Sequence, residues 1–190
     1  MSRLAWPAVA LCLVGPAWWL GWQPDASSSP WALRPALAWH APGWLASLWT
    51  AAWVHASPAH LLMNVCGAIA VAMAGWALAM PARGALAWLL SWPLCHLLMF
   101  VDDRVAWYVG ASGVLHAGVA LLAVQAWRTW GRVAGGSLLL MLAVKLCLDV
   151  SAGFPLAERA SMGITVVTLS HLIGTLCGLF LAGFLPSRFP

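Results

Sequence analysis

A serine flanked by glycines at the start of an apolar segment is the most promising candidate for chemistry in this sequence. The run Gly110-Ala111-Ser112-Gly113 leads into an apolar stretch over 112–127. Glycines on both sides let the backbone turn tightly and let another group approach the hydroxyl. A helix that begins here directs unpaired N–H groups, and the positive end of its dipole, towards a developing oxyanion. The same pattern also occurs where membrane helices pack closely. It indicates a nucleophile only if other catalytic side chains lie nearby.

Serine needs an adjacent base, and His171 is the residue that we expect to supply it. The spacing of His171, Gly174 and Gly178 puts two glycines on the face that carries the histidine, and Gly113 and Ala117 form a matching face. Small residues four apart let membrane helices pack backbone to backbone, which would bring the imidazole to the serine hydroxyl. No aspartate or glutamate stands where it would obviously orient the histidine. The sequence therefore predicts a dyad rather than a triad.

Further polar residues begin other apolar segments. His60 and Asn64 are four apart and share a helix face, with His55 just before them, and His116 lies one turn after Ser112. These groups and His171 lie in the second, fourth and sixth apolar segments. One return crossing separates each of these segments from the next, so all three cross the membrane in the same direction. We expect the histidine of the last segment about two turns below its start. The polar groups then gather near the outer surface in a cavity that water can enter.

The elements that must position these residues are membrane helices. Of 190 residues, 63% are hydrophobic and only 7% are charged, against roughly a quarter charged in ordinary globular domains. The apolar runs are long and unbroken, whereas a barrel would alternate polar and apolar residues over short strands. We predict an all-α membrane protein with one domain over 1–190. Its six transmembrane helices are expected at about 5–22, 60–80, 84–100, 112–127, 136–152 and 165–185.

The distribution of arginines predicts how these helices are oriented. Positive charge is favoured on the cytoplasmic side, and five of the arginines share one side if the N-terminus lies inside. Both chain ends are then cytoplasmic. The cytoplasmic set is Arg3, Arg83, Arg128, Arg132 and Arg188, and the outer set is Arg34, Arg104 and Arg159. The connection over 23–59 is rich in tryptophan, so we expect it to lie half-buried in the membrane interface.

Other functions have partial support. Lys145 and Asp149 are four apart in an apolar segment, which is typical of a self-neutralising pair and also of an ion-coupled transporter. A haem protein could use histidines from two helices as axial ligands. The five cysteines form no CxxC pair, so the sequence predicts neither a disulfide framework nor a metal site. The net charge of +4 comes from scattered residues, which gives no basis for nucleic-acid binding.

Taken together, these motifs resemble the rhomboid family of intramembrane serine proteases. The resemblance depends on Gly110-x-Ser112-Gly113 before one helix, on His171-x-x-Gly174-x-x-x-Gly178 in the last, and on His55 followed by His60-x-x-x-Asn64. It implies that Ser112 is the nucleophile and that His171 is the general base and then the general acid. It also implies that His60, Asn64 and the backbone N–H of Ser112 form the oxyanion site. His55 corresponds to a structural histidine.

One departure narrows the resemblance. His116 stands where many rhomboid proteases have a tyrosine, and the run from Trp107 to His116 is similar to the rhombosortase branch of bacterial rhomboids. That branch is associated with substrates that carry a C-terminal Gly-Gly motif, a hydrophobic helix and a basic end. The resemblance implies a cofactor-free protease of the bacterial inner membrane with its site on the periplasmic side. The role of His116 and the oligomeric state stay open.

Overall fold

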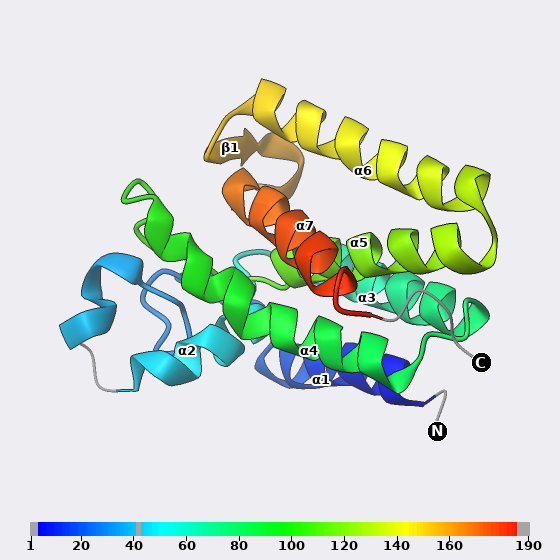
Figure 1. Cartoon of the computed structure of the whole chain (residues 1–190). Helices are drawn as coiled ribbons and strands as arrows, with labels where there is room; N and C mark the ends of the chain where they lie inside the picture. The colour runs from blue at the N-terminus through cyan, green and yellow to red at the C-terminus, as the bar shows by residue number, and fades with distance from the viewer. Residues whose placement is uncertain (1–3, 41–42, 186–190) are drawn as a thin grey trace.

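A computed structural model describes residues 4–40 and 43–185 and is mostly helical (Figure 1). Within these ranges there are six α-helices of 15 to 21 residues and a shorter one of 7 residues, α2 (Trp44–Thr50). The six long helices are α1 (Ala5–Leu20), α3 (Pro58–Ala77), α4 (Ala82–Leu97), α5 (Ser112–Thr129), α6 (Arg132–Ala152) and α7 (Thr168–Ala182).

The predicted helical fold class is confirmed. Among the described residues, three helical stretches are long and apolar enough to cross a membrane by themselves: Pro58–Ala77, Ala82–Val101 and Arg132–Ala152. The helix Arg132–Ala152 begins four residues before residue 136, the predicted start of that helix. Shorter apolar helices occupy Ala5–Leu20 and Thr168–Ala182. The chain is a helical membrane protein, and the count of six spans stays a prediction, as does the division into a single domain.

Helix α5 lies at the centre of the bundle. It packs against α3, α4, α6 and α7, while α1 lies against α3 and α4 (Figure 1). Its side chains are buried almost along its whole length, from Gly113 to Ala126. The serine at its first residue therefore begins a helix that the other long helices enclose.

Buried tryptophans connect the helices through hydrogen bonds from their indole N–H groups. Trp6 of α1 donates to the carbonyl of Val71 at 2.9 Å, and Trp88 of α4 donates to that of Val114 at 2.8 Å. The rings of Trp6 and Trp88 also stack, with centroids 4.5 Å apart. An indole combines a large apolar surface with one donor, so it fills the bundle interior and leaves no buried polar atom of its own unpaired.

The connection between α1 and α3 folds compactly. It contains two short 3₁₀ helices, η1 (Pro35–His40) and η2 (Ala51–Trp53), on either side of α2. Helix α2 packs on α4, where His96 is fully buried and its Nδ1 donates to the carbonyl of Leu48 at 2.7 Å. The position of the 23–59 connection in the membrane interface stays a prediction.

A two-stranded hairpin before α7 was not predicted. Strand β1 (Leu156–Arg159) pairs antiparallel with β2 (Ile164–Val167), and η4 (Ala160–Met162) lies between them. The predicted helix over 165–185 is therefore wrong at its start, because α7 begins only at Thr168. The residues over 164–167 are mainly β-branched and favour a strand, but a short apolar run of this kind cannot be told from a helix start by its pattern alone.

Candidate active site

Ser112 is the first residue of α5, and the loop before it is fixed by the connection that precedes α3. The backbone N–H of Gly110 donates to the carbonyl of Ala51 at 2.8 Å, and Tyr108 pairs with Leu33. Gly110 has a φ of 102°, and a side chain there would collide with the ring of His60. Glycine is needed at this position because it alone adopts that backbone conformation easily and leaves room for the histidine.

His171 projects from the first turn of α7 towards Ser112. Its Nε2 lies 3.0 Å from the Ser112 Oγ, which is within hydrogen-bonding distance. The expected depth of two turns is wrong, because α7 begins at Thr168 rather than at 165. The hydroxyl and the imidazole thus meet at the ends of two helices that both begin at this side of the bundle.

Small residues bring these two helices together. A Cβ atom on Gly174 would overlap the carbonyl of Gly113, and one on Gly178 would overlap that of Ala117. A Cβ on Gly113 would in turn meet the backbone carbonyl of Ser170 at 2.9 Å. Backbone contact at this distance is possible only with glycine or alanine on the shared faces. The close approach of α5 and α7 sets the distance between the serine and the histidine.

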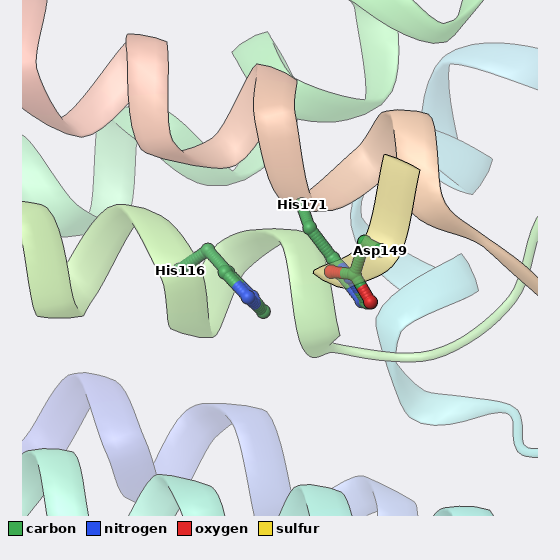
Figure 2. Close-up of side chains that lie close together, drawn as sticks. All are labelled: His116, Asp149 and His171. Carbon is green, nitrogen blue, oxygen red and sulfur yellow. The ribbon is translucent and has the colours of Figure 1, made fainter. Parts of the chain in front are cut away.

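A carboxylate orients His171, and the expectation that none would is wrong. Asp149 Oδ2 lies 2.7 Å from His171 Nδ1, with 3% of the aspartate side chain exposed and 7% of the histidine side chain exposed (Figure 2). Asp149 comes from the last turn of α6, which reaches α7 through the hairpin. The three side chains therefore form a chain of contacts from Asp149 through His171 to Ser112.

Two cationic side chains also contact Asp149. Lys145 of α6 pairs with Oδ2, and Arg159 of β1 donates from Nη2 to Oδ1 at 2.9 Å. Lys145 Nζ also lies 3.4 Å from His171 Nδ1, farther than the aspartate oxygen. The interpretation of Lys145 and Asp149 as an isolated neutral pair is therefore incomplete, because the carboxylate is shared among three partners.

His116 stacks on His171. The ring centroids are 4.2 Å apart and the ring planes differ by 11°, and Figure 2 shows His116 projecting from the helix that faces α7. The Nδ1 of His116 lies 2.7 Å from the Ser112 carbonyl, to which it donates. This bond and the stacking leave the His171 ring little freedom to rotate away from Ser112.

His60 and Asn64 line the same space from α3. The hydroxyl of Ser57 caps this helix by accepting from the His60 N–H at 3.1 Å, with proline as the next residue. Within the described part of the chain, the buried atoms His60 Nδ1 and Asn64 Nδ2 have no hydrogen-bond partner. An unpaired buried donor costs about 1–3 kcal/mol. Because both residues line the cavity, a ligand or a transition state there could supply the missing partner.

His55 lies behind His60 and outside the cavity. Only 1% of it is exposed, its Nδ1 donates to the Trp53 carbonyl at 3.3 Å, and its ring meets that of His60 edge to face. Burial, together with the neighbouring His60, lowers the pKa of His55 to about 3 from an ordinary 6.5. The residue is accordingly a neutral packing group in the folded chain.

This burial predicts a pH-dependent stability. His55 takes up a proton far more easily when unfolded, so its contribution to stability is complete above pH 6.5 and decreases as the pH falls from 6.5 towards 3. The loss approaches about 1.4 kcal/mol per pH unit within that window. Thermal unfolding of the wild type and of His55→Gln in detergent at pH 7 and pH 5 measures it. The variant should lose less stability on acidification, and an equal loss would contradict the assignment.

Within the described ranges, Ser112 borders a larger and a smaller cavity. The larger, of about 680 Å³, is lined by His60, Asn64 and His171 and by apolar residues of α3 and α6. The smaller, of about 220 Å³, lies against Trp107 and the residues of β2. A nucleophile with space on its accessible side can receive a polypeptide backbone.

The same cluster does not suit a metal or a haem. Ligand atoms of His116, Asp149 and His171 lie within 4.8 Å of one another. However, Lys145 and Arg159 already contact both carboxylate oxygens and would repel a cation. The two histidine rings are stacked, so their in-plane lone pairs do not converge on an iron between them. Lys145 and Asp149 also have an explanation within this site, which weakens the transporter interpretation.

Sequence reasoning missed Asp149 as a partner of His171, and it missed Arg159. A signal for the first was present, because Asp149 lies near the end of one helix and His171 near the start of the next. Consecutive antiparallel helices place those ends at the same side of a membrane. Arg159 could not be found in this way because it depends on the hairpin.

The fold and the site define a helical membrane protein with a serine and a histidine in contact at the wall of a cavity. Residues 42–188 match the Rhomboid domain, and the chain therefore belongs to the rhomboid family. Its members are intramembrane serine proteases that act on transmembrane substrates within the bilayer. Neither the curated proteins nor the solved structures include a significant match. The matched range contains Ser112, His171 and every other residue of the site.

Proposed function

We propose that this chain is an intramembrane serine endopeptidase with Ser112 as its nucleophile and His171 as its general base. The observation that carries the proposal is the 3.0 Å contact between Ser112 Oγ and His171 Nε2 at the wall of a 680 Å³ cavity. Serine attacks a carbonyl only when an adjacent base takes its proton. Family membership supports the same reaction class.

Acylation begins when a substrate helix enters from the bilayer and unwinds at the site. Unwinding is required because the carbonyls of an intact helix are hydrogen-bonded and shielded. The Ser112 oxygen then bonds to the carbonyl carbon while His171 Nε2 takes the hydroxyl proton. Collapse of the tetrahedral intermediate breaks the peptide bond, and His171 gives the proton to the leaving amine. Water next attacks the acyl-enzyme by the same route and releases the acid.

The oxyanion is stabilised by His60, Asn64 and the backbone N–H of Ser112. The unpaired buried nitrogens of His60 and Asn64 support this role, because donors that are fixed before the reaction need no reorganisation. Gly110 supports it too, since only glycine leaves room for the His60 ring beside the nucleophile.

Replacing Asn64 by alanine is therefore expected to lower kcat by about 10²–10³-fold, with little change in KM. The amide contributes mainly when negative charge develops, so substrate binding should change little. Steady-state cleavage by the reconstituted protein measures both constants. Gln23→Ala, which removes an amide outside the cavity, serves as the control, and a raised KM with unchanged kcat would contradict the role.

The substrates that we propose carry a C-terminal Gly-Gly motif followed by a hydrophobic helix and a basic end. The similarity of residues 107–116 to the rhombosortase branch suggests this class. Helix physics supports it, because each glycine disfavours a helix by about 1 kcal/mol relative to alanine. A Gly-Gly pair near the outer membrane surface thus marks a point where the substrate unwinds at low cost.

We also propose a location in the bacterial inner membrane, with both ends cytoplasmic and the site on the periplasmic side. Arg83, Arg128 and Arg132 lie near the helix ends away from the site, whereas Arg104 and Arg159 lie near the site. With Arg34 the outer set has three arginines, so the excess of positive charge inside depends on Arg3 and Arg188, which lie outside the described residues. Counted over the sequence, five arginines against three favour a site that faces outwards.

The test is cleavage by purified protein in liposomes of a fusion that ends in Gly-Gly, an apolar helix and basic residues. Mass spectrometry of the released product should show a new C-terminus at or next to the glycines. A matched fusion with Leu-Leu in place of Gly-Gly controls for the motif. No cleavage of either fusion, or of other transmembrane segments, would overturn the proposed function.

A further inference from the structure

Asp149 is the least expected polar residue of the site. It lies near the end of α6, a mostly apolar helix, and 3% of its side chain is exposed. A carboxylate buried in a membrane protein is costly unless it is paired and hydrogen-bonded. Figure 2 shows it close to the His171 ring, and its Oδ2 lies 2.7 Å from Nδ1.

The geometry sets which nitrogen of His171 carries the proton. An ionised carboxylate only accepts hydrogen bonds, so the Nδ1 of His171 must donate to Asp149. The other nitrogen, Nε2, is then unprotonated in the neutral ring and accepts from the Ser112 hydroxyl at 3.0 Å. A base needs this tautomer, because the opposite one presents an N–H to the serine and cannot take its proton.

The charged neighbours stabilise Asp149 in the same position. Lys145 contacts one oxygen and Arg159 the other. The remaining titratable groups that face His171 are His116, stacked on its ring, and His60, across the cavity. The aspartate is therefore the one negative group that these described neighbours present to the histidine. The carboxylate of Asp149 therefore stabilises the positive charge that forms on the imidazole during the reaction.

We propose that Asp149 is a positioning residue of the reaction, so that the site works as an Asp149–His171–Ser112 triad. This inference rests on the proposed function. In the reaction the Ser112 proton moves to His171 Nε2 and later to the leaving amine, while Asp149 keeps its charge and takes no proton. Lys145 and Arg159 hold the carboxylate towards His171, and the β1–β2 hairpin contributes through Arg159.

A purely structural ion pair makes a different prediction. If Asp149 only neutralised Lys145 and Arg159, an isosteric asparagine would lower the stability of the fold and leave the folded enzyme active. If it positions His171, the asparagine amide would donate to Nδ1 and shift the proton to Nε2. The base would then be present in the wrong tautomer, in a protein with nearly unchanged geometry.

The test is the rate at which a fluorophosphonate labels Ser112, because it reports on the nucleophile and base without a natural substrate. We expect Asp149→Asn to lower the maximal labelling rate by about 10²–10⁴-fold, with the probe's half-saturating concentration within about threefold of wild type. Asp103→Asn, which removes an exposed acidic side chain, should label like wild type. Asp149→Glu, which restores a carboxylate, should recover part of the rate.

The outcomes separate this inference from the proposed function. An active wild type with an equally fast Asp149→Asn variant overturns the triad and leaves the protease intact. A wild type that neither labels nor cleaves overturns the proposed function itself. If Asp149→Asn does not fold, the ¹⁵N NMR spectrum of His171 in the resting wild type decides. The Nδ1-protonated tautomer supports the triad, and the Nε2-protonated tautomer overturns it.

Discussion

Replacing Ser112 by alanine is expected to lower cleavage of a Gly-Gly-tailed substrate by about 10⁶-fold in kcat. The variant keeps α5, the oxyanion donors and the cavity but has no oxygen that can bond to the scissile carbonyl. Replacing His171 by alanine should cost about as much, since serine without a base is a poor nucleophile. The double variant should be no slower than either single variant, because the two residues act as a unit.

The control for this prediction is Ser151→Ala, which removes an exposed hydroxyl from the end of α6. It should cleave at the wild-type rate. Product appearance by gel and mass spectrometry, with the folded fraction measured by thermal unfolding, separates loss of chemistry from loss of structure. Cleavage by folded Ser112→Ala within tenfold of wild type would mean that another group attacks the substrate.

The second large effect is expected from Gly174→Val. A side chain at this position overlaps the backbone carbonyl of Gly113, which cannot rotate away. The helices α5 and α7 would have to separate, and a displacement of about 1 Å is enough to cost on the order of 10²-fold in rate. Overpacking also lowers the free energy of unfolding by about 1–3 kcal/mol or more. Cleavage should therefore fall by at least about 10²-fold, and further by the share of the protein that no longer folds.

Gly15→Val is the matched control, because a Cβ atom at Gly15 of α1 meets no atom within 4 Å. That variant should unfold near the wild-type temperature and keep its cleavage rate. Thermal unfolding in detergent and cleavage in liposomes check both variants. Wild-type activity in Gly174→Val would show that the contact between α5 and α7 does not set the geometry of the site.

The helices could be predicted from the sequence because each one is a long, nearly unbroken run of apolar residues. Long apolar runs specify helices at membrane depth, where every backbone group must find an internal partner. The structure places α1, α3, α4, α5 and α6 within a few residues of the predicted ranges. The strand over 164–167 could not be predicted, since a short, mostly apolar run before a helix has the same pattern as the first turn of that helix.

Part of the site could be predicted for a different reason. Small residues at spacing four predicted the helix faces that meet, and so the contact between Ser112 and His171. The partner of His171 was missed because Lys145 is close to Asp149 in sequence, whereas His171 is 22 residues away. The pair with Lys145, four residues away, already accounted for the buried aspartate, so no distant partner was expected. Arg159 reaches the site only through the hairpin, which no local pattern indicates.

The most direct test of the account is fluorophosphonate labelling of the purified protein, followed by peptide mapping. We expect the serine oxygen to displace fluoride at a single residue, Ser112, and we expect His171→Ala to remove the labelling while Ser151→Ala keeps it. Labelling at another serine, or equal labelling of the folded His171→Ala variant, would contradict the claim that these two side chains form one reactive unit.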